Sequence, residues 1–302
     1  MPIKEAMQQL ALQAIGQRLR SITGSDSSLE AFKTPLGDVG MFGPESMAWR
    51  VHAHFTAMLA GGLSSLIVQS LHPRALAAVW DHSDFRTRLK DRLEKTSYFV
   101  AATTYGSQAL AMQSIDKVNW IHSKIHGFDL QGRPYIANEP DLIQWVHTVE
   151  VASFLQAYQH LSLSPLSLPQ CDQYFSEMTQ VGHLLGANNL PITWSETQAL
   201  WFSYSDQLCF DERAQEILQI IESFPTDWVD QPFMKLLLPK ASKSGKSIGF
   251  SKVPPLCEKL NFTKNRLFSA NVSAAKFHAP QSLKPLKPCT KIIRGAFVFL
   301  SS

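Results

Sequence analysis

The chain has 302 residues, of which 45% are hydrophobic and 18% are charged, so it is long and apolar enough to bury a sizeable core. This composition excludes an intrinsically disordered chain. The net charge of +3 is unevenly spread, because residues 235–302 hold 13 of the 28 Lys and Arg residues and only one acid, Glu258. We predict one helical domain over residues 1–235 and a basic, partly ordered tail over residues 236–302.

The N-terminal segment 4–20 is predicted to be an amphipathic helix, since its several glutamines interrupt the apolar core that a secretion signal needs. The four cysteines are widely scattered, which is typical of a protein in a reducing compartment and predicts a cytoplasmic location. The spacing also excludes a zinc ribbon and a covalently attached c-type haem.

Residues 55–73 contain no charged Lys, Arg, Asp or Glu, which raises the question of a membrane span. A spanning helix needs about 20 mostly apolar residues, whereas this stretch includes Gln69, His72 and several hydroxyl side chains. A buried core helix is the better interpretation. Gly61 and Gly62 would let another helix, or a flat cofactor, come close to its backbone.

Helical periodicity dominates the chain, and no segment alternates as a strand would. Asn138 is predicted to cap a helix that has Pro140 in its first turn. Loop signals at 37–44, 129–135 and 161–170 separate the predicted helices. We therefore predict an all-α fold with helices at about 4–20, 47–71, 73–80, 86–113, 114–127, 139–161, 170–186, 194–206 and 211–223.

Two histidines lie on apolar helical stripes. Ile115, Val118, His122 and Ile125 share one face, so the imidazole of His122 points into the core, where it either forms a hydrogen bond or binds a metal. His126 follows one turn later and completes an HxxxH pair, but no third ligand is near in sequence. His147 occupies a similar stripe in the helix over 139–161, and the same two interpretations apply to it.

Arg92, Lys95 and Thr96 lie close together on the helix over 86–113. Arginine and threonine entering an apolar face could neutralise a cofactor carboxylate or polarise bound dioxygen. The alternative is a surface charge cluster, since Lys90 and Glu94 crowd the same turns. Dinucleotide, P-loop, serine-hydrolase, zinc-protease and di-iron carboxylate motifs are all missing from the sequence.

Taken in order, several short motifs resemble the bacterial relatives of the MpaB-type oxygenases, whose helical domain is shared with the latex-clearing rubber oxygenases. The resemblance covers about residues 37–225. It is carried by GxFGPxSxxWRVH (40–52), QSLHPxxLAxVWDHSDF (69–85), RLxKT (92–96), VxxIHxxxxG (118–127), GRPYxA (132–137), PxLxxWVH (140–147) and QYFSEMxxVGxLLG (173–186).

This resemblance implies a globin-like helical core that encloses haem b. It makes His122 the proximal iron ligand, places Lys95 on the distal side, and puts Arg92 and Thr96 in the catalytic site against the haem. His147 is expected to support the haem pocket. Asn119 stands where the family often has arginine. None of the acids between residues 69 and 92 matches the acid that is the proposed base of the rubber oxygenases.

The function implied is a haem b-dependent oxygenase that uses dioxygen to cleave a C=C bond, or to insert oxygen, in a small isoprenoid or lipid-like substrate. The alternative is a haem- or lipid-binding helical protein without turnover. In either case the basic segment Lys235–Ser302 could contact an anionic membrane surface. A nucleic-acid partner is not expected, because the excess of basic residues is confined to that tail.

Overall fold

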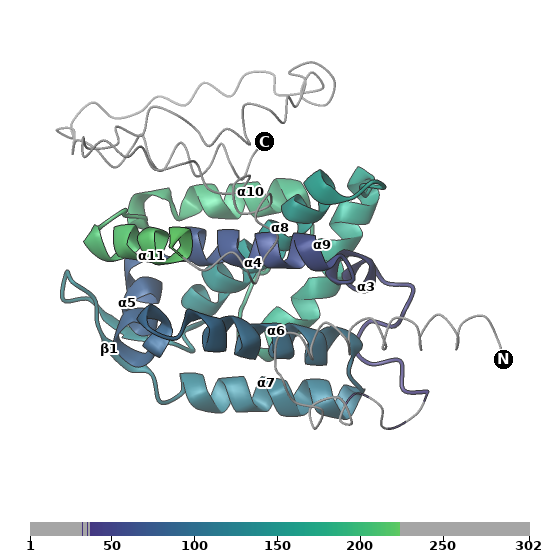
Figure 1. Cartoon of the computed structure of the whole chain (residues 1–302), viewed down its shortest axis with the longest axis horizontal. Helices are drawn as coiled ribbons and strands as arrows, with labels where there is room; N and C mark the ends of the chain where they lie inside the picture. The colour runs from purple at the N-terminus through teal and green to yellow at the C-terminus, as the bar shows by residue number, and fades with distance from the viewer. Residues whose placement is uncertain (1–31, 33–34, 36, 224–302) are drawn as a thin grey trace, which may run out of the picture. The chain divides into compact units, whose positions relative to one another are not determined.

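The computed structural model describes residue 32, residue 35 and residues 37–223, and the regular secondary structure of this part is almost all helix (Figure 1). The all-α prediction is confirmed. The predicted helix over 4–20, the domain boundary at 235 and the basic tail lie outside the described residues. The helices are α3 (Met47–His52), α4 (Phe55–Gln69), α5 (Pro73–His82), α6 (Leu89–Tyr105), α7 (Gln108–His122), α8 (Pro140–Leu161), α9 (Leu168–Leu184), α10 (Trp194–Ser203) and α11 (Glu212–Glu222), with single 3-10 turns η1 (Asp84–Arg86) and η2 (Ser205–Gln207).

Two predicted helix boundaries are wrong. The helix predicted over 47–71 is two helices, because the side chain of His54 accepts the N–H of Ala57 and starts α4 afresh. The break predicted at 113–114 lies instead at Gly106, after which Ser107 caps α7. Capping decided both boundaries, and an apolar period alone does not reveal it.

The start of α8 also differs in detail from the prediction. Glu139, not Asn138, is the N-cap residue, and no side-chain hydrogen bond caps the helix. The Glu139 carboxylate instead accepts the N–H of Ile136 and pairs with Arg74 of α5. Pro140 occupies the first turn as predicted, so the tertiary ion pair has taken the capping side chain's place.

A small antiparallel hairpin was not predicted. It consists of β1 (His126–Phe128) and β2 (Pro134–Ile136), with Gly127 opposite Tyr135. The buried Asp129 carboxylate holds its turn, since it accepts the N–H groups of Gln131 and Arg133 at 2.9 Å and pairs with the Arg133 guanidinium. Two strands of three residues are too short to show a period of two in the sequence.

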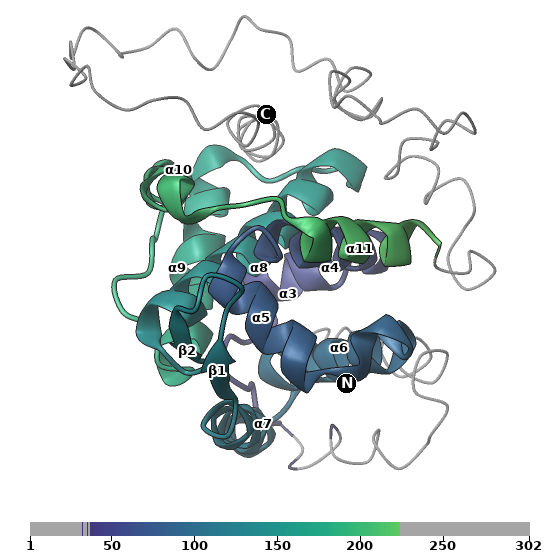
Figure 2. The same cartoon turned by 90° about the vertical axis from the view of Figure 1, so that its left-hand side faces the viewer.

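The centre of the fold is the packing of α4 against α8, with α6 and α7 side by side next to this pair (Figures 1 and 2). At Gly61 a Cβ atom would lie only 2.8 Å from the Cα of Phe154 and 2.8 Å from the carbonyl oxygen of Ser153. Of the two sequence-based explanations for this glycine, the structure therefore supports the close approach of another helix.

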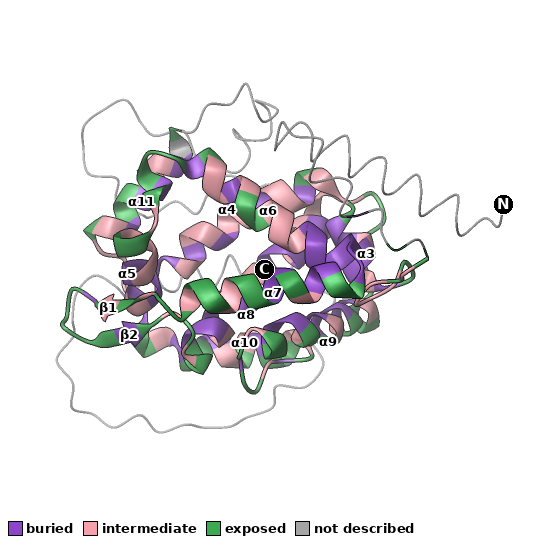
Figure 3. Cartoon of the chain, turned by 90° about the horizontal axis from the view of Figure 1, so that it is seen from below, coloured by how far each residue is buried: buried purple, intermediate pink, exposed green. Residues whose placement is uncertain are grey.

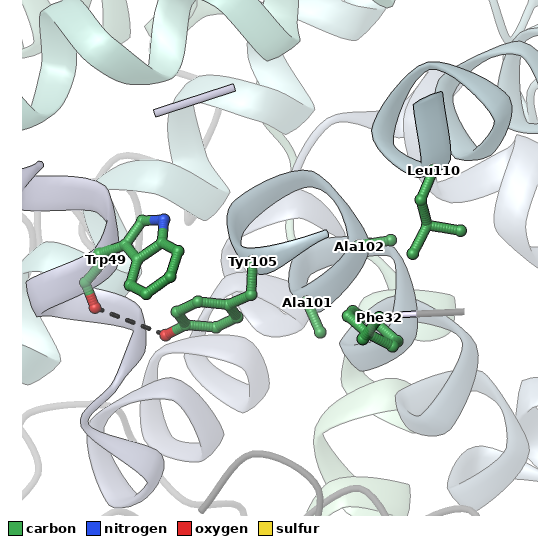
Figure 4. Packing of buried hydrophobic residues seen from close by; sticks show 6 residues of the cluster. All are labelled: Phe32, Trp49, Ala101, Ala102, Tyr105 and Leu110. Atoms are coloured by element: carbon green, nitrogen blue, oxygen red, sulfur yellow. Dashed lines mark hydrogen bonds between the residues drawn. The ribbon is translucent and has the colours of Figure 1, made fainter. Parts of the chain in front are cut away.

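A second apolar cluster joins α3 to α6 and α7 (Figure 4). Within it the rings of Trp49 and Tyr105 meet edge to face at 5.0 Å, and the Tyr105 hydroxyl donates to the Trp49 carbonyl at 3.4 Å. The opposite side of α7 faces outward and is exposed (Figure 3). One face of α7 therefore remains for the interior, and this face carries His122 at its C-terminal end.

Within the described residues, no single helix combines the length and apolar character needed to cross a membrane. Together α4 and α5 reach that length and composition, but they are bent by 108° at the break between them.

Candidate functional site

A mostly apolar cavity of about 180 Å³ is formed among α4, α5, α6, α7, α8 and α11. Apolar walls with a few convergent polar groups are typical of small-molecule sites. Three isoleucines of α11 form one wall, while α5 and α8 provide most of the rest. The apolar lining residues are Leu66, Ala75, Leu76, Ala78, Val79, Phe85, Leu89, Ile125, Ala137, Leu142, Ile143, Val146, Ile217, Ile220 and Ile221.

Six polar residues also line the cavity, and two of them differ from the rest in their bonding. Gln69, Ser70 and His82 each pair with a backbone carbonyl group at 2.7 to 3.3 Å. The hydroxyl of Ser83 accepts from Arg92. In contrast, Nε of Arg92 and Nδ1 of His122 are buried and have no hydrogen-bond partner. A buried polar atom left unpaired costs about 1–3 kcal/mol, so these two atoms are the candidate contacts of this cavity for a polar group of a ligand.

His122 ends α7 and lies on the predicted stripe, one turn beyond the partly buried Val118. Burial lowers the pKa of its imidazole below the ordinary value of 6.5, and the positive charge of Arg92 lowers it further. The ring is therefore neutral at neutral pH. A neutral imidazole with an unpaired nitrogen has the state that a metal ligand requires.

Arg92 enters the cavity from α6, where burial lowers the pKa of its guanidinium. The charge that offsets this effect is that of Glu150 on α8. Burial raises the pKa of the Glu150 carboxyl from 4.5 to about 7, against the opposing influence of Arg92. Each charge therefore acts on the pKa of the other group, yet among the described ion pairs none joins Arg92 to Glu150.

The other predicted site residues are not among those lining the cavity. Lys95 and Thr96 follow Arg92 on α6 but are exposed. His147 is buried and turned toward α9, where its Nε2 lies 2.9 Å from the carbonyl oxygen of Met178. Gly182 leaves room for this ring, because a Cβ there would come within 2.6 Å of His147 Cδ2. The structure thus brings together Arg92 and His122 alone of the five predicted residues.

The alternative HxxxH pair is not formed on one helix. α7 ends at His122, and His126 lies exposed in β1. Asn119, the position at which the family often has arginine, donates its side-chain amide to the carbonyl of Leu184 at 2.9 Å. This residue ties α7 to the end of α9 and does not line the cavity.

Sequence reasoning missed two components of the site. The isoleucines at 217, 220 and 221 recur with helical spacing, a signal that predicts a buried stripe. Glu150 lies three residues beyond His147 on the helix predicted over 139–161, and it does not itself line the cavity. Its relation to Arg92 depends on the distance between two helices, for which the sequence carries no signal.

The fold and the cavity together define a class: an all-α domain with a mostly apolar cavity lined by one arginine and two histidines, of which His122 has a buried nitrogen without a partner. The family model described as ER-bound oxygenase mpaB/B'/Rubber oxygenase, catalytic domain, matches residues 49–245, more than half of the chain. The chain therefore belongs to this family and carries an oxygenase-type catalytic domain, as the motifs predicted. No match was found among curated proteins or among solved structures.

Proposed function

We propose that the chain is a haem b-dependent oxygenase acting on an apolar isoprenoid or lipid-like substrate. The observation that carries this proposal is His122, a neutral imidazole with an unpaired buried nitrogen at the wall of an apolar cavity. Membership of the oxygenase family supplies the reaction class.

The residues of the cavity fit haem better than a metal held by protein ligands alone. Among the described residues, no three His, Cys, Asp or Glu side chains come together in a way that could hold a metal ion. One imidazole is sufficient when a cofactor supplies the remaining ligands, as in haem proteins with a single axial histidine. Haem b also carries carboxylate groups, and the buried guanidinium of Arg92 is a suitable partner for one of them.

Bound haem would supply the redox chemistry by which dioxygen attacks an apolar substrate. The chain would supply the surroundings for that chemistry. His122 would hold the iron, and Arg92 would bind a carboxylate and keep positive charge at the cavity wall. The isoleucines of α11, with Leu76 and Val79 of α5, would hold an apolar chain and exclude water.

Lys95, Thr96 and His147 keep their predicted roles as hypotheses within this proposal. Lys95 would serve as a displaceable distal ligand, and Thr96 would act beside Arg92. His147 would support the pocket indirectly, because its bond to Met178 fixes α8 against α9. The peripheral membrane contact through Lys235–Ser302 likewise remains a hypothesis.

The first test is haem binding by the full chain, measured by absorption titration and a pyridine haemochrome assay. We expect one b-type haem per chain, with loss of binding in His122→Ala and retention in His126→Ala. His126 is a matched control, since it lies four residues away and is exposed. Equal retention in both variants would exclude His122 as the ligand. A folded but colourless protein would refute the haem proposal and favour the lipid-binding alternative.

The second test concerns turnover. The haem-loaded protein is incubated with labelled dioxygen and squalene, an isoprenoid with several C=C bonds, and products are identified by mass spectrometry. Oxidative cleavage places one oxygen atom on each carbon of the broken bond, so both carbonyl fragments should carry label. Haem binding without oxygen uptake across a panel of isoprenoids and unsaturated lipids would favour a binding protein without turnover.

A further inference from the structure

Arg92 is short of partners in the described part of the chain. A guanidinium has five N–H donors and stays charged in proteins. Only one hydrogen bond is formed, from Nη1 to the Ser83 hydroxyl at a long 3.4 Å, and Nε is buried without a partner. A charge that is largely removed from water needs an opposite charge and further acceptors. The cavity in front of Arg92 is where these acceptors would bind.

Burial lowers the pKa of Arg92, and Glu150 is the acid whose negative charge raises it. Ile143 and Val146 line the cavity from α8, and Glu150 follows at the same helical spacing, so it lies on the same face about one turn further on. Its charge acts on Arg92, but the two are not in a direct ion pair. Arg92, a partly buried cation, therefore has no direct ion-pair partner within the described residues, and Glu150 itself does not line the cavity.

Few ionisable groups on the neighbouring helices could pair with Glu150 in place of Arg92. α4, which packs along α8, has no ionisable side chain over residues 55–69. On α9, burial raises the pKa of Tyr174, and the negative charge of Glu150 raises it further. The Tyr174 hydroxyl lies 2.9 Å from His52 of α3, whose pKa burial lowers to about 3, so this histidine is neutral. The negative charge of Glu177 of α9 also raises the pKa of Tyr174. Within residues 37–223, Arg92 is the one cation whose charge acts on Glu150.

We propose that Arg92 and Glu150 form a proton-linked site for the carboxylate group of an apolar ligand, in which Glu150 takes up one proton as the carboxylate binds to Arg92. This inference rests on the proposed function in one respect, the assignment of Arg92 to a carboxylate. It adds a ligand class, an apolar molecule with an anionic end, and a regulator of affinity, the pH.

The physical reason is repulsion between two carboxylates that share one guanidinium in an apolar setting. In low dielectric, two like charges beside one cation are not both stable, and the one that can protonate does so. Burial already raises the pKa of Glu150 to about 7. A second carboxylate bound at Arg92 raises this pKa further, so Glu150 takes up a proton near neutral pH. The carboxylate of the ligand then interacts with Arg92 without competition from a charged Glu150.

Two kinds of molecule carry this chemistry: a cofactor with a propionate group and a substrate with a carboxylate end. Octanoate is a suitable probe because it combines a short apolar chain with a carboxylate. Octanol is the matched neutral control. Binding of each is measured by titration calorimetry on the full chain between pH 6 and pH 9, where the carboxyl group of octanoate is ionised.

Octanoate should bind with constant affinity up to about pH 7, and the affinity should then fall up to about tenfold per pH unit. Calorimetry in two buffers of different ionisation enthalpy should show uptake of close to one proton at pH 8. Octanol should bind with no pH dependence. His82→Gln is a further control, since His82 also lines the cavity, and this variant should keep the slope.

Glu150→Gln should remove the slope and bind octanoate more tightly than the wild type at pH 9. Arg92→Met should bind octanoate no more tightly than octanol. The inference is overturned if the wild-type affinity is independent of pH, if Glu150→Gln keeps the slope, or if Arg92→Met still prefers octanoate. Retained octanol binding in each variant shows that the cavity is intact.

Repeating the titration with haem-loaded protein separates the two sources. If loading abolishes octanoate binding, the cofactor's own carboxylate occupies Arg92; if the pH-dependent binding persists, the site serves a substrate carboxylate. The result is also distinguishable from failure of the proposed function. Octanoate linkage without haem binding would refute the haem proposal alone, and haem binding without the linkage would refute this inference alone.

Discussion

Replacing Glu150 by glutamine changes the pH dependence of stability in a way that can be calculated. The pKa of the carboxyl is 4.5 in the exposed state and about 7 in the folded chain. Because the folded value is the higher one, folding favours the protonated acid. The wild type therefore loses stability as the pH rises from 4.5 to 7, while a glutamine at this position does not titrate.

The size of the effect follows from the shift of about 2.5 units between these two values. Each unit corresponds to about 1.4 kcal/mol, so Glu150→Gln should be more stable than the wild type by up to about 3 kcal/mol at pH 8. This figure is an upper limit because the side chain is only partly buried. The two proteins should differ little from this cause at pH 4.5.

The assay is urea unfolding of the haem-free full chain, followed by far-ultraviolet circular dichroism at pH 5, 6, 7 and 8. Glu45 is exposed, so Glu45→Gln is the matched control and should reproduce the wild-type pH dependence. If the advantage of Glu150→Gln at pH 8 is no larger than at pH 5, then Glu150 is not held in a partly buried, poorly paired state, and the reasoning is refuted.

Three other predictions use different features. Gly61→Ala should lose about 1–3 kcal/mol of unfolding free energy, since its Cβ would lie 2.8 Å from Phe154, whereas Gly62→Ala, with 3.8 Å to the same side chain, should lose none in urea unfolding. His147→Leu should lose about 1–3 kcal/mol at pH 7 by leaving a carbonyl unpaired, and its deficit should shrink below pH 6.5, because burial lowers the wild-type pKa to about 4; a constant deficit would contradict this. Lys95→Ala should alter the resting absorption spectrum of the haem-loaded protein without releasing haem, and an unchanged spectrum would remove Lys95 from the distal side.

Much of the site could be predicted before the structure, because two of its residues lie on regular helices. The stripe that carries His122 and the helix that carries Arg92 follow from hydrophobic period and charge spacing. Motif order then indicated the family. These are local signals, and the structure places both residues at one cavity.

Other features had no local signal. Lys95 is three residues from Arg92, yet it is exposed while Arg92 enters the cavity. His147 shared the same kind of stripe as His122, but its ring meets α9. A helical face gives the direction of a side chain, and only the packing of neighbouring helices decides what it meets.

The sequence by itself determined the helical class, the family and the position of His122 on an inward face, because periodicity and motif order are properties of the chain alone. Local capping by His54, which the period does not encode, decided where α4 begins, whereas the ion pair of Glu139 with Arg74 at the start of α8 belongs to the tertiary structure. Tertiary structure also decided that the charge of Glu150 acts on Arg92 without a direct ion pair between the two side chains. Burial and the field of a distant charge depend on how separate helices pack, and these two effects set the chemistry of the cavity.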